Sequence, residues 1–244
     1  MENINFNVLP PDKSPPIPAL EIHKLTVFRG SQKIVGPLSL AVFPGEIFGI
    51  FGPNECGKTT LLKAAGNLLP LKNGPITWFG RPSLAHAPEQ LFRRIGQQIQ
   101  STPVITDLTV DEQLRLLGRV RLQTPRELPI WIDRMYGAFP QLYKRRRTRA
   151  ANLNGGHRGL LSVASALVGL TNGLLLLDEP TNNLSPKAAE ALSQTVIQNA
   201  ETHNNAVLIV SHDFKWLKAV QNRGILNFGS RSFKIGRASC RERV

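Results

Sequence analysis

Apolar and polar positions follow two different periods along the chain, which predict strands and helices in turn. Residues 20–28 alternate as a half-buried strand does, and apolar runs at 38–42, 46–51, 76–79, 94–100, 174–177 and 206–210 predict further strands. Apolar residues at helical spacing predict helices at 60–69, 88–94, 109–120, 153–168 and 186–196. Strands that alternate with helices in this way predict an α/β fold.

Composition divides the chain into three parts. Residues 1–19 carry five prolines and little apolar periodicity, so we expect a disordered or extended leader. Residues 20–233 are expected to form one domain with a helical segment inserted at about 101–152, where a charged, leucine-containing sequence is interrupted at Pro125, Pro129 and Pro140. Residues 235–244 match the translation of a common sequencing adapter, so we expect 234–244 to be foreign and the natural chain to be truncated near Phe233.

Residues 52–60 carry the strongest chemical motif of the chain. They fit Gly-x-x-x-x-Gly-Lys-[Ser/Thr] and lie between a predicted strand and a predicted helix, with the residues Gly52, Pro53, Asn54, Glu55, Cys56, Gly57, Lys58, Thr59 and Thr60. Glycines let backbone N–H groups point inward, and the helix N-terminus adds positive potential, so a polyphosphate can bind. Lys58 is expected to reach the outer phosphates and Thr59 to help hold Mg²⁺. The alternative is a glycine turn that binds nothing; the agreement of glycines, lysine, hydroxyl and flanking elements argues against it.

A second polar group follows two of the predicted strands. Asp178 and Glu179 come directly after the apolar run 174–177, and His212 comes shortly after the run 206–210. Ligands bind at this edge of open α/β sheets. Asp178 can hold the shell of a magnesium ion, and Glu179 can polarise an attacking water. An acidic pair that only ends a strand is the alternative, and the phosphate loop upstream argues against it.

The charge of the chain points to an anionic partner only weakly. The net charge is +13, from 30 Lys and Arg against 17 Asp and Glu, and a basic segment at 144–149 contributes to it. Without residues 235–244, which hold three Arg and one Glu, it falls by 2 to +11. Because aromatic residues are not interleaved with the basic segment, as base stacking requires, we expect a solvated basic face and no nucleic-acid partner.

Other features of the sequence concern location and redox chemistry. No apolar run approaches the roughly 18 to 20 residues that span a membrane, and the N-terminus lacks the basic and apolar parts of a signal peptide. We therefore expect a cytoplasmic protein. The two cysteines, Cys56 and Cys240, allow no disulfide framework or metal cluster to be predicted.

Residues 153–157 resemble the signature motif of a known protein family. Their sequence Leu-Asn-Gly-Gly-His resembles the Leu-Ser-Gly-Gly-Gln signature of ABC-transporter ATP-binding subunits, and it lies at the start of a helix upstream of the Asp178–Glu179 strand. Together with the phosphate loop, it makes the chain similar to this family over about residues 20–233. The resemblance implies a P-loop, ABC-type ATPase core with an N-terminal antiparallel β subdomain and an inserted helical subdomain.

The resemblance also implies ligands and partners. ATP and Mg²⁺ would bind between the phosphate loop of one protomer and Asn154, Gly155 and Gly156 of another, in a homodimer or a heterodimer with a second ABC ATPase subunit. Separate integral-membrane permease subunits would place the protein at the inner face of the cell membrane.

Further roles follow from the resemblance residue by residue. Gln100 matches the glutamine that senses the metal and the nucleophile, although Gln97 and Gln98 leave the register open. His212 matches the switch histidine that contacts the γ-phosphate. Glu179, His212 and Gln100 would then be catalytic, and Thr59, Asp178 and Gln100 would hold the metal. Phe28 or Arg29 would replace the adenine-stacking aromatic residue of the family.

Several positions depart from the family pattern. Asn154 and His157 replace the serine and glutamine of the signature, and Ser185 replaces an aspartate in the following loop, 181–185, where we expect it to cap a helix. Glu55 and Cys56 replace small residues, and we expect Glu55 to point to solvent. These departures leave open a degenerate subunit that binds ATP and hydrolyses it slowly.

Only short stretches of sequence indicate which substrate is transported. Residues 138–147 are similar to the ATPases of branched-chain amino-acid importers, whereas 99–108 and 27–30 are similar to lipid-transport ATPases of the bacterial envelope. The first match is longer and favours amino-acid import. A soluble ABC ATPase of DNA repair or translation is a further alternative, which the absence of a second ATPase unit or a long coiled-coil insert argues against.

Overall fold

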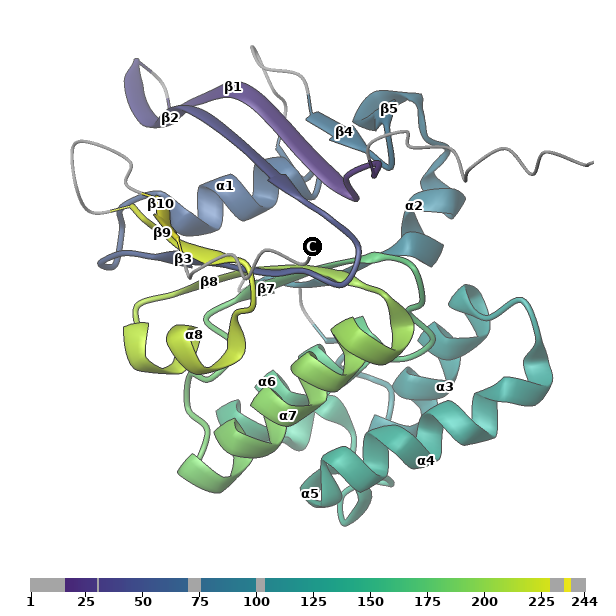
Figure 1. Ribbon diagram of the computed structural model, residues 1–244. Coiled ribbons are helices and arrows are strands. Elements are labelled where there is room, and N and C mark those ends of the chain that lie inside the picture. Colours follow the sequence, from purple (N-terminus) through teal and green to yellow (C-terminus); the bar gives the residue numbers. More distant parts are fainter. Residues whose placement is uncertain (1–15, 30, 70–75, 100–103, 229–234, 238–244) are drawn as a thin grey trace, which may run out of the picture.

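Helix α1 (Lys58–Ala65) lies between two β-sheets (Figure 1). The computed structural model describes residues 16–29, 31–69, 76–99, 104–228 and 235–237. One sheet is antiparallel with the order β2-β1-β4-β5, formed by β1 (Leu20–Arg29), β2 (Gln32–Val42), β4 (Ile76–Trp78) and β5 (Arg81–Pro82).

The second sheet is central, and its order is β10-β9-β3-β8-β7-β6. Its strands are β3 (Ile47–Phe51), β6 (Ile95–Gln98), β7 (Leu174–Asp178), β8 (Ala206–Ser211), β9 (Gly224–Asn227) and β10 (Ile235–Arg237). Neighbouring strands are parallel except β9 and β10. β10 belongs to the segment 234–244, whose foreign origin stays a prediction.

Burial on both faces explains the apolar runs of the central strands. In β7, Leu174 and Leu176 pack in a core with α1 and the antiparallel sheet, whereas Leu175 and Leu177 pack in a second core with the helices of the opposite face. Successive strand residues point to opposite faces, so a run of four leucines fills both cores. These two cores hold the carboxyl ends of β3, β7 and β8 at one edge of the sheet.

Helices cover the face of the central sheet opposite α1 (Figure 1). They are α6 (Gly155–Leu167), α7 (Pro186–His203) and α8 (Phe214–Val220). A helical segment between β6 and α6 holds α3 (Val110–Arg121), α4 (Leu128–Ala138) and α5 (Pro140–Tyr143), and α2 (Pro88–Arg94) lies beside α3. Three short 3₁₀ turns complete the helical part, at Ser83–Ala85, Pro125–Glu127 and Ala150–Asn152. None of the described helices is both long and apolar enough to cross a membrane.

Local signals set the start of several helices. Thr109 and Glu112 form a capping box at α3, in which the Glu112 carboxylate accepts from Thr109 N at 2.8 Å. The Ser185 hydroxyl accepts from Ala188 N at 3.3 Å and begins α7, as expected. Prolines 125, 129 and 140 lie in the first turns of helical elements. The helical segment is interrupted before Pro125 and before Pro140, as expected. Pro129 interrupts no helix and lies in the first turn of α4, because the first turn needs no N–H from proline.

Three predicted boundaries were wrong, and one of them is the end of α7, which lies at His203 and not at residue 196. α1 ends at Ala65 and not near residue 69, because Gly66 caps it and Asn67 turns the chain with a φ of 56°. β2 begins at Gln32 and not at residue 38, because the strand continues through irregular pairing with β1. Gly36 lies in this irregular stretch with a φ of 96°, and the Gly36–Pro37 pair there hid the strand, because such a pair is typical of a turn.

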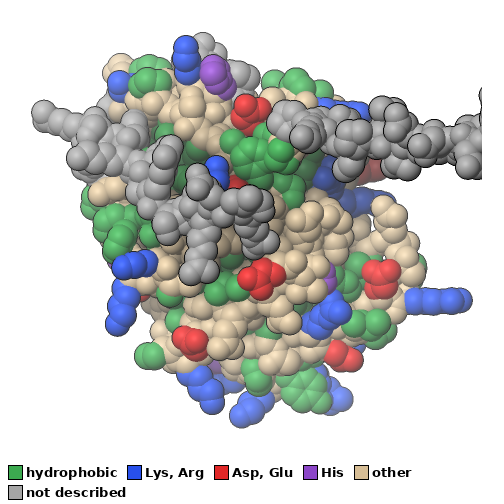
Figure 2. Space-filling model, viewed as in Figure 1, with side chains coloured by type: hydrophobic (Ala, Val, Ile, Leu, Met, Phe, Trp, Pro, Cys, Tyr) green, Lys and Arg blue, Asp and Glu red, His purple; other side chains and the backbone are tan. Residues whose placement is uncertain are grey.

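The basic segment lies on the surface of the helical part. Lys144, Arg145, Arg147 and Arg149 are exposed, and Arg146 lies over the Tyr143 ring at 4.3 Å. Figure 2 shows Lys and Arg side chains along the lower edge of the molecule, where Figure 1 places α4 and α5. The segment therefore forms a solvated basic face.

Arg121 ties α3 to the end of α6. Its Nη1 donates to the backbone oxygens of Ser165, Ala166 and Val168 at 2.6 to 3.1 Å, and its Nε donates to Phe92 O at 3.3 Å. These are carbonyls that a helix end leaves without partners of its own. Burial lowers the pKa of the Arg121 guanidinium to about 10.

We expect Arg121→Leu to lower the free energy of unfolding by about 3 kcal/mol, because several buried carbonyls lose their donors together. Urea unfolding followed by circular dichroism measures the change. Arg119→Leu is the matched control, since Arg119 is exposed on the same helix, and its effect should stay within about 0.5 kcal/mol. Equal effects of the two substitutions would contradict the capping role.

Candidate functional site

The phosphate loop joins β3 to α1 through an unusual backbone. Gly57 has a φ of 101° and Glu55 a φ of 64°, both in the left-handed region. A Cβ atom on Gly57 would lie 3.0 Å from Ile34 O of β2, so glycine fits both the conformation and the space. Glu55 is exposed, as expected, and Cys56 is partly buried. Gly52 is buried, Pro53 and Asn54 are exposed, and Thr60 is half-buried.

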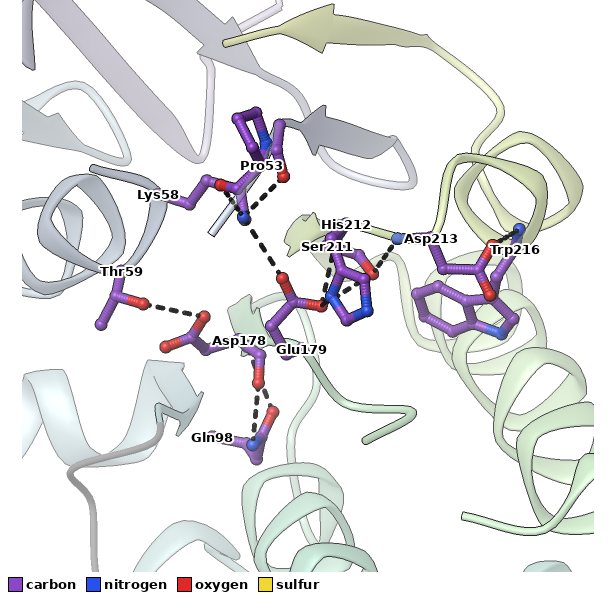
Figure 3. Close-up of polar contacts among 11 residues, drawn as sticks. Pro53, Lys58, Thr59, Gln98, Asp178, Glu179, Ser211, His212, Asp213 and Trp216 are labelled. Atoms are coloured by element: carbon purple, nitrogen blue, oxygen red, sulfur yellow. Dashed lines mark hydrogen bonds and ion pairs between the residues drawn. The ribbon is translucent and has the colours of Figure 1, made fainter. Parts of the chain in front are cut away.

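Lys58 bridges the loop to the acidic pair. Its Nζ donates to Gly52 O and to Pro53 O, each at 2.7 Å, and lies 3.4 Å from Glu179 Oε1 (Figure 3). Only 5% of Lys58 is exposed. The structure thus holds a buried cation at the mouth of the loop, where it can bind the outer oxygens of a polyphosphate.

Thr59 and Asp178 bring two oxygen groups together from different elements. The Thr59 hydroxyl donates to Asp178 Oδ1 at 3.2 Å, from the first turn of α1 to the end of β7 (Figure 3). Mg²⁺ prefers oxygen ligands and is bound through one or two protein groups together with waters and substrate phosphates. Among the described residues, no group of three or more His, Cys, Asp or Glu side chains is arranged to hold a metal ion. The hydroxyl of Thr59 and the carboxylate of Asp178 are oxygen groups of the kind that fit Mg²⁺ shared with a nucleotide.

Glu179 is buried and held at one carboxylate oxygen. Its Oε2 accepts from Ser211 Oγ at 3.0 Å and from His212 N at 3.1 Å, and His212 Nδ1 lies 2.8 Å away (Figure 3). Its Oε1 has no hydrogen-bond partner among the described residues and faces only Lys58. A carboxylate with one oxygen fixed and the other without a hydrogen-bond donor can orient a water and accept its proton.

Ser211 and Asp213 complete this arrangement, and sequence reasoning gave neither a role in holding Glu179. Asp213 N donates to Ser211 Oγ at 3.1 Å, and Asp213 Oδ1 accepts from Trp216 N at 2.9 Å as the cap of α8. The available signal was their position beside His212 at the end of a strand. The start of α8 therefore fixes the side chains that hold Glu179.

Two glutamines of β6, Gln97 and Gln98, make different contacts. Gln97 Nε2 donates to Gly66 O at 3.2 Å, and the Gln98 side chain bonds the backbone of Asp178. Gln100, the residue expected to sense the metal, lies outside the described residues, so its role stays a prediction. The contact between Gln98 and Asp178 could not be predicted from the sequence, because the apolar pattern does not show which residues of β6 and β7 pair.

The signature residues lie at the start of α6. Asn154 Oδ1 accepts from His157 N at 2.9 Å and lies 2.6 Å from His157 Nδ1. Burial, and then the charge of Arg145, hold the pKa of His157 below its usual value. Gly156 packs against Asn183 of the loop before α7, where a Cβ would lie 2.5 Å from Asn183 O. Asparagine therefore keeps the capping role that serine would have.

The signature residues line two cavities, one of which also holds the acidic pair. Gly155 lines a cavity of about 390 Å³ with Asp178 and Glu179, whereas Asn154, Gly156 and His157 line another of about 460 Å³. No contact joins Asn154 to Lys58 among those found between described side chains. Phe28 is exposed near the turn between β1 and β2, and the side chain of Arg29 lies outside the described part.

Comparison with known proteins places this arrangement in a family. The family model described as ABC transporter matches residues 35–182. The Nod factor export ATP-binding protein I of Cupriavidus pinatubonensis is 32% identical over 205 residues, which cover 81% of this chain and 61% of that protein. The zinc import ATP-binding protein ZnuC of Cereibacter sphaeroides is 33% identical, over 83% of this chain and 76% of that protein. The chain thus spans about three fifths of the Nod factor export relative.

Solved structures share the fold. An ATP-binding subunit of an ABC transporter superposes with a TM-score of 0.77 at 22% identity, covering 89% of this chain and 90% of that one. A dimeric bacterial ABC transporter cassette superposes with a TM-score of 0.75 at 21% identity, covering 90% of this chain and 100% of that one. With the matched family model and the relatives above, the chain belongs to the ABC transporter family, as a nucleotide-binding domain.

Proposed function

We propose that this chain is the ATP-binding and ATP-hydrolysing subunit of a transporter, acting through separate membrane permease subunits. The convergence of Lys58, Thr59, Asp178, Glu179 and His212 at the carboxyl ends of β3, β7 and β8 carries the proposal. These side chains supply a cation for phosphate, oxygens for a metal and a base for water. Mg²⁺, when bound, supplies charge neutralisation between the phosphates.

Each residue then has one task in ATP hydrolysis. Lys58 binds the outer phosphate oxygens and stabilises the charge that develops on them. Glu179 Oε1 orients the attacking water and accepts its proton, while Ser211 and the His212 backbone hold Oε2 in place. His212 lies half-exposed beside Glu179 and contacts the γ-phosphate.

The separation of signature and phosphate loop supports a dimer. Asn154, Gly155 and Gly156 would complete the ATP site of a second protomer, where the N-terminus of α6 offers its N–H groups to the γ-phosphate. Gly155 and Gly156 permit a close approach of the backbone. The related dimeric cassette is consistent with this geometry, although its identity of 21% shows the fold alone. The second protomer is a copy of this chain or another ABC ATPase subunit.

An apolar groove supports a membrane-embedded partner. Leu68, Phe92 and Ile105 are 49%, 56% and 42% exposed, and all three line a cavity of about 430 Å³ between α1, α2 and α3. Exposed apolar groups around a groove mark contact surfaces. We assign this groove to a permease subunit, and the protein would then lie at the inner face of the membrane.

Substrate and direction rest on resemblance. The named relatives are proteins of Nod factor export and of zinc import. Amino-acid import therefore stays a prediction drawn from residues 138–147, and lipid transport stays the alternative. Binding without efficient hydrolysis is the second candidate function, since Asn154 and His157 depart from the family signature. The buried, oriented Glu179 favours hydrolysis.

Asn154→Asp tests the composite site. Aspartate caps a helix as well as asparagine, so α6 should be retained while a negative charge faces the phosphate of the partner's ATP. We expect ATP turnover to fall about tenfold or more, because like charges oppose the closed dimer. Phosphate release by Asn154→Asp is compared with that of Asn154→Ser, which keeps the cap without the charge. Wild-type turnover in Asn154→Asp would show that the signature takes no part.

A further inference from the structure

Gln98 holds the backbone of Asp178 at two atoms. Its Nε2 donates to Asp178 O at 3.2 Å, and its Oε1 accepts from Asp178 N at 3.1 Å (Figure 3). Only 8% of Gln98 is exposed. In the ladder between β6 and β7, Gln98 pairs with Leu177, one residue before Asp178. The side-chain amide of Gln98 therefore bonds both peptide groups of Asp178 from the β6 side.

The opposite side of this segment is held by β8. Asp178 pairs with Val210 in the ladder, and Glu179 N donates to Val210 O at 2.9 Å. Glu179 then leaves the strand with a φ of 47°. The two acidic residues are thus fixed between Gln98 on one side and β8 on the other, and loss of Gln98 would leave the Asp178 peptide groups without these buried bonds.

We propose that Gln98 is a positioning residue that aims the Asp178 carboxylate at the Thr59 hydroxyl, so that both can bind Mg²⁺ together with a nucleotide. Gln98 touches neither ligand and acts through the backbone of Asp178. The inference rests on the proposed ATP function. It adds a role for Gln98, which precedes Gln100, the glutamine that is expected to sense the metal.

Gln98→Met tests the role, because methionine has a similar length and lacks both polar groups. Calorimetry measures ATP affinity with Mg²⁺ and with EDTA, without any turnover. We expect the gain in affinity that Mg²⁺ confers to shrink about tenfold, because two hydrogen bonds that hold the metal carboxylate are lost. The affinity in EDTA should stay within about twofold, since the phosphate loop is unchanged.

Gln97→Met is the matched control. It makes the same chemical change one residue away, on the opposite face of β6, where Gln97 bonds Gly66 O. The Mg²⁺ gain should equal that of the wild type. If Gln98→Met does not fold, Gln98→Asn keeps a buried amide that is too short to reach both Asp178 atoms, and the same selective loss is expected.

The outcomes separate two failures. An unchanged Mg²⁺ gain in the Gln98 variant, or an equal loss of affinity with Mg²⁺ and with EDTA, would overturn the positioning role. A wild-type protein whose ATP affinity does not respond to Mg²⁺ would instead contradict the proposed function itself.

Discussion

Glu179→Gln is expected to lower ATP turnover by about two to three orders of magnitude, because a general base contributes about 10²- to 10⁴-fold to such a step. Glutamine has nearly the shape of glutamate, so the contacts around Ser211 and His212 can be kept in part. The amide cannot accept a proton from water at neutral pH. ATP binding should be retained, since Lys58, Thr59 and the loop backbone are untouched. Single-turnover phosphate release at saturating Mg²⁺ and ATP measures the effect.

The control for this substitution is Glu201→Gln. Glu201 is exposed near the end of α7, away from the site, and the same chemical change there should leave turnover unaltered. If Glu179→Gln retained the wild-type rate, Glu179 could not be the base, and the roles given to Ser211 and His212 as its supports would lose their basis.

Lys58→Ala is expected to weaken ATP binding by about a hundredfold. A charge-assisted hydrogen bond contributes about 1.5 to 3 kcal/mol, and Lys58 is buried at the mouth of the loop, where water does not compete fully. The substitution also leaves Glu179 Oε1 without its cationic neighbour at 3.4 Å, which adds repulsion toward phosphate. Calorimetric titration with ATP and Mg²⁺ measures the loss.

Lys63→Ala provides the comparison on the same helix. Lys63 lies in the last turn of α1, at the end away from the loop, so its removal should change ATP affinity by no more than about twofold. Equal affinities for the Lys58 and Lys63 variants would mean that the loop does not bind phosphate through Lys58.

Much of the fold could be predicted because apolar runs indicate buried strands and capping residues indicate helix starts. The four leucines of β7 pack into two cores, and a short uninterrupted apolar run of this length is typical of a strand that is buried on both faces. The capping box at Thr109 and the Ser185–Pro186 start of α7 are local signals, which depend on neighbouring residues only. The α/β core and the antiparallel sheet beside it agree with the expectation.

Two of the errors had different causes, one local and one tertiary. Leu68 continues the apolar spacing of α1, yet the helix ends at Ala65 because Gly66 and Asn67 turn the chain. Leu68 is then exposed beside the groove assigned to a permease. In β2, the polar start of the strand is held by pairing with β1, which a single stretch of sequence does not reveal.

The candidate site also has a part that could be predicted from the sequence and a part that could not. Lys58, Thr59, Asp178, Glu179 and His212 could be named from motifs, because their chemistry depends on residue type and spacing. The residues that hold these side chains in place, Gln98 and Ser211, could not be named from motifs. Gln98 meets Asp178 only because β6 ends one residue short in its ladder, and Ser211 meets Glu179 only because β7 and β8 are neighbours.

Mixing two inactive variants tests the central claim, that one ATP site is built from two protomers, most directly. Lys58→Ala lacks a working loop and Asn154→Asp a working signature, so neither alone should hydrolyse ATP efficiently. In an equal mixture half of the dimers are mixed, and each holds one intact site of two, so about a quarter of wild-type turnover should return. A mixture as inactive as its components, while the wild type hydrolyses ATP, would contradict the account.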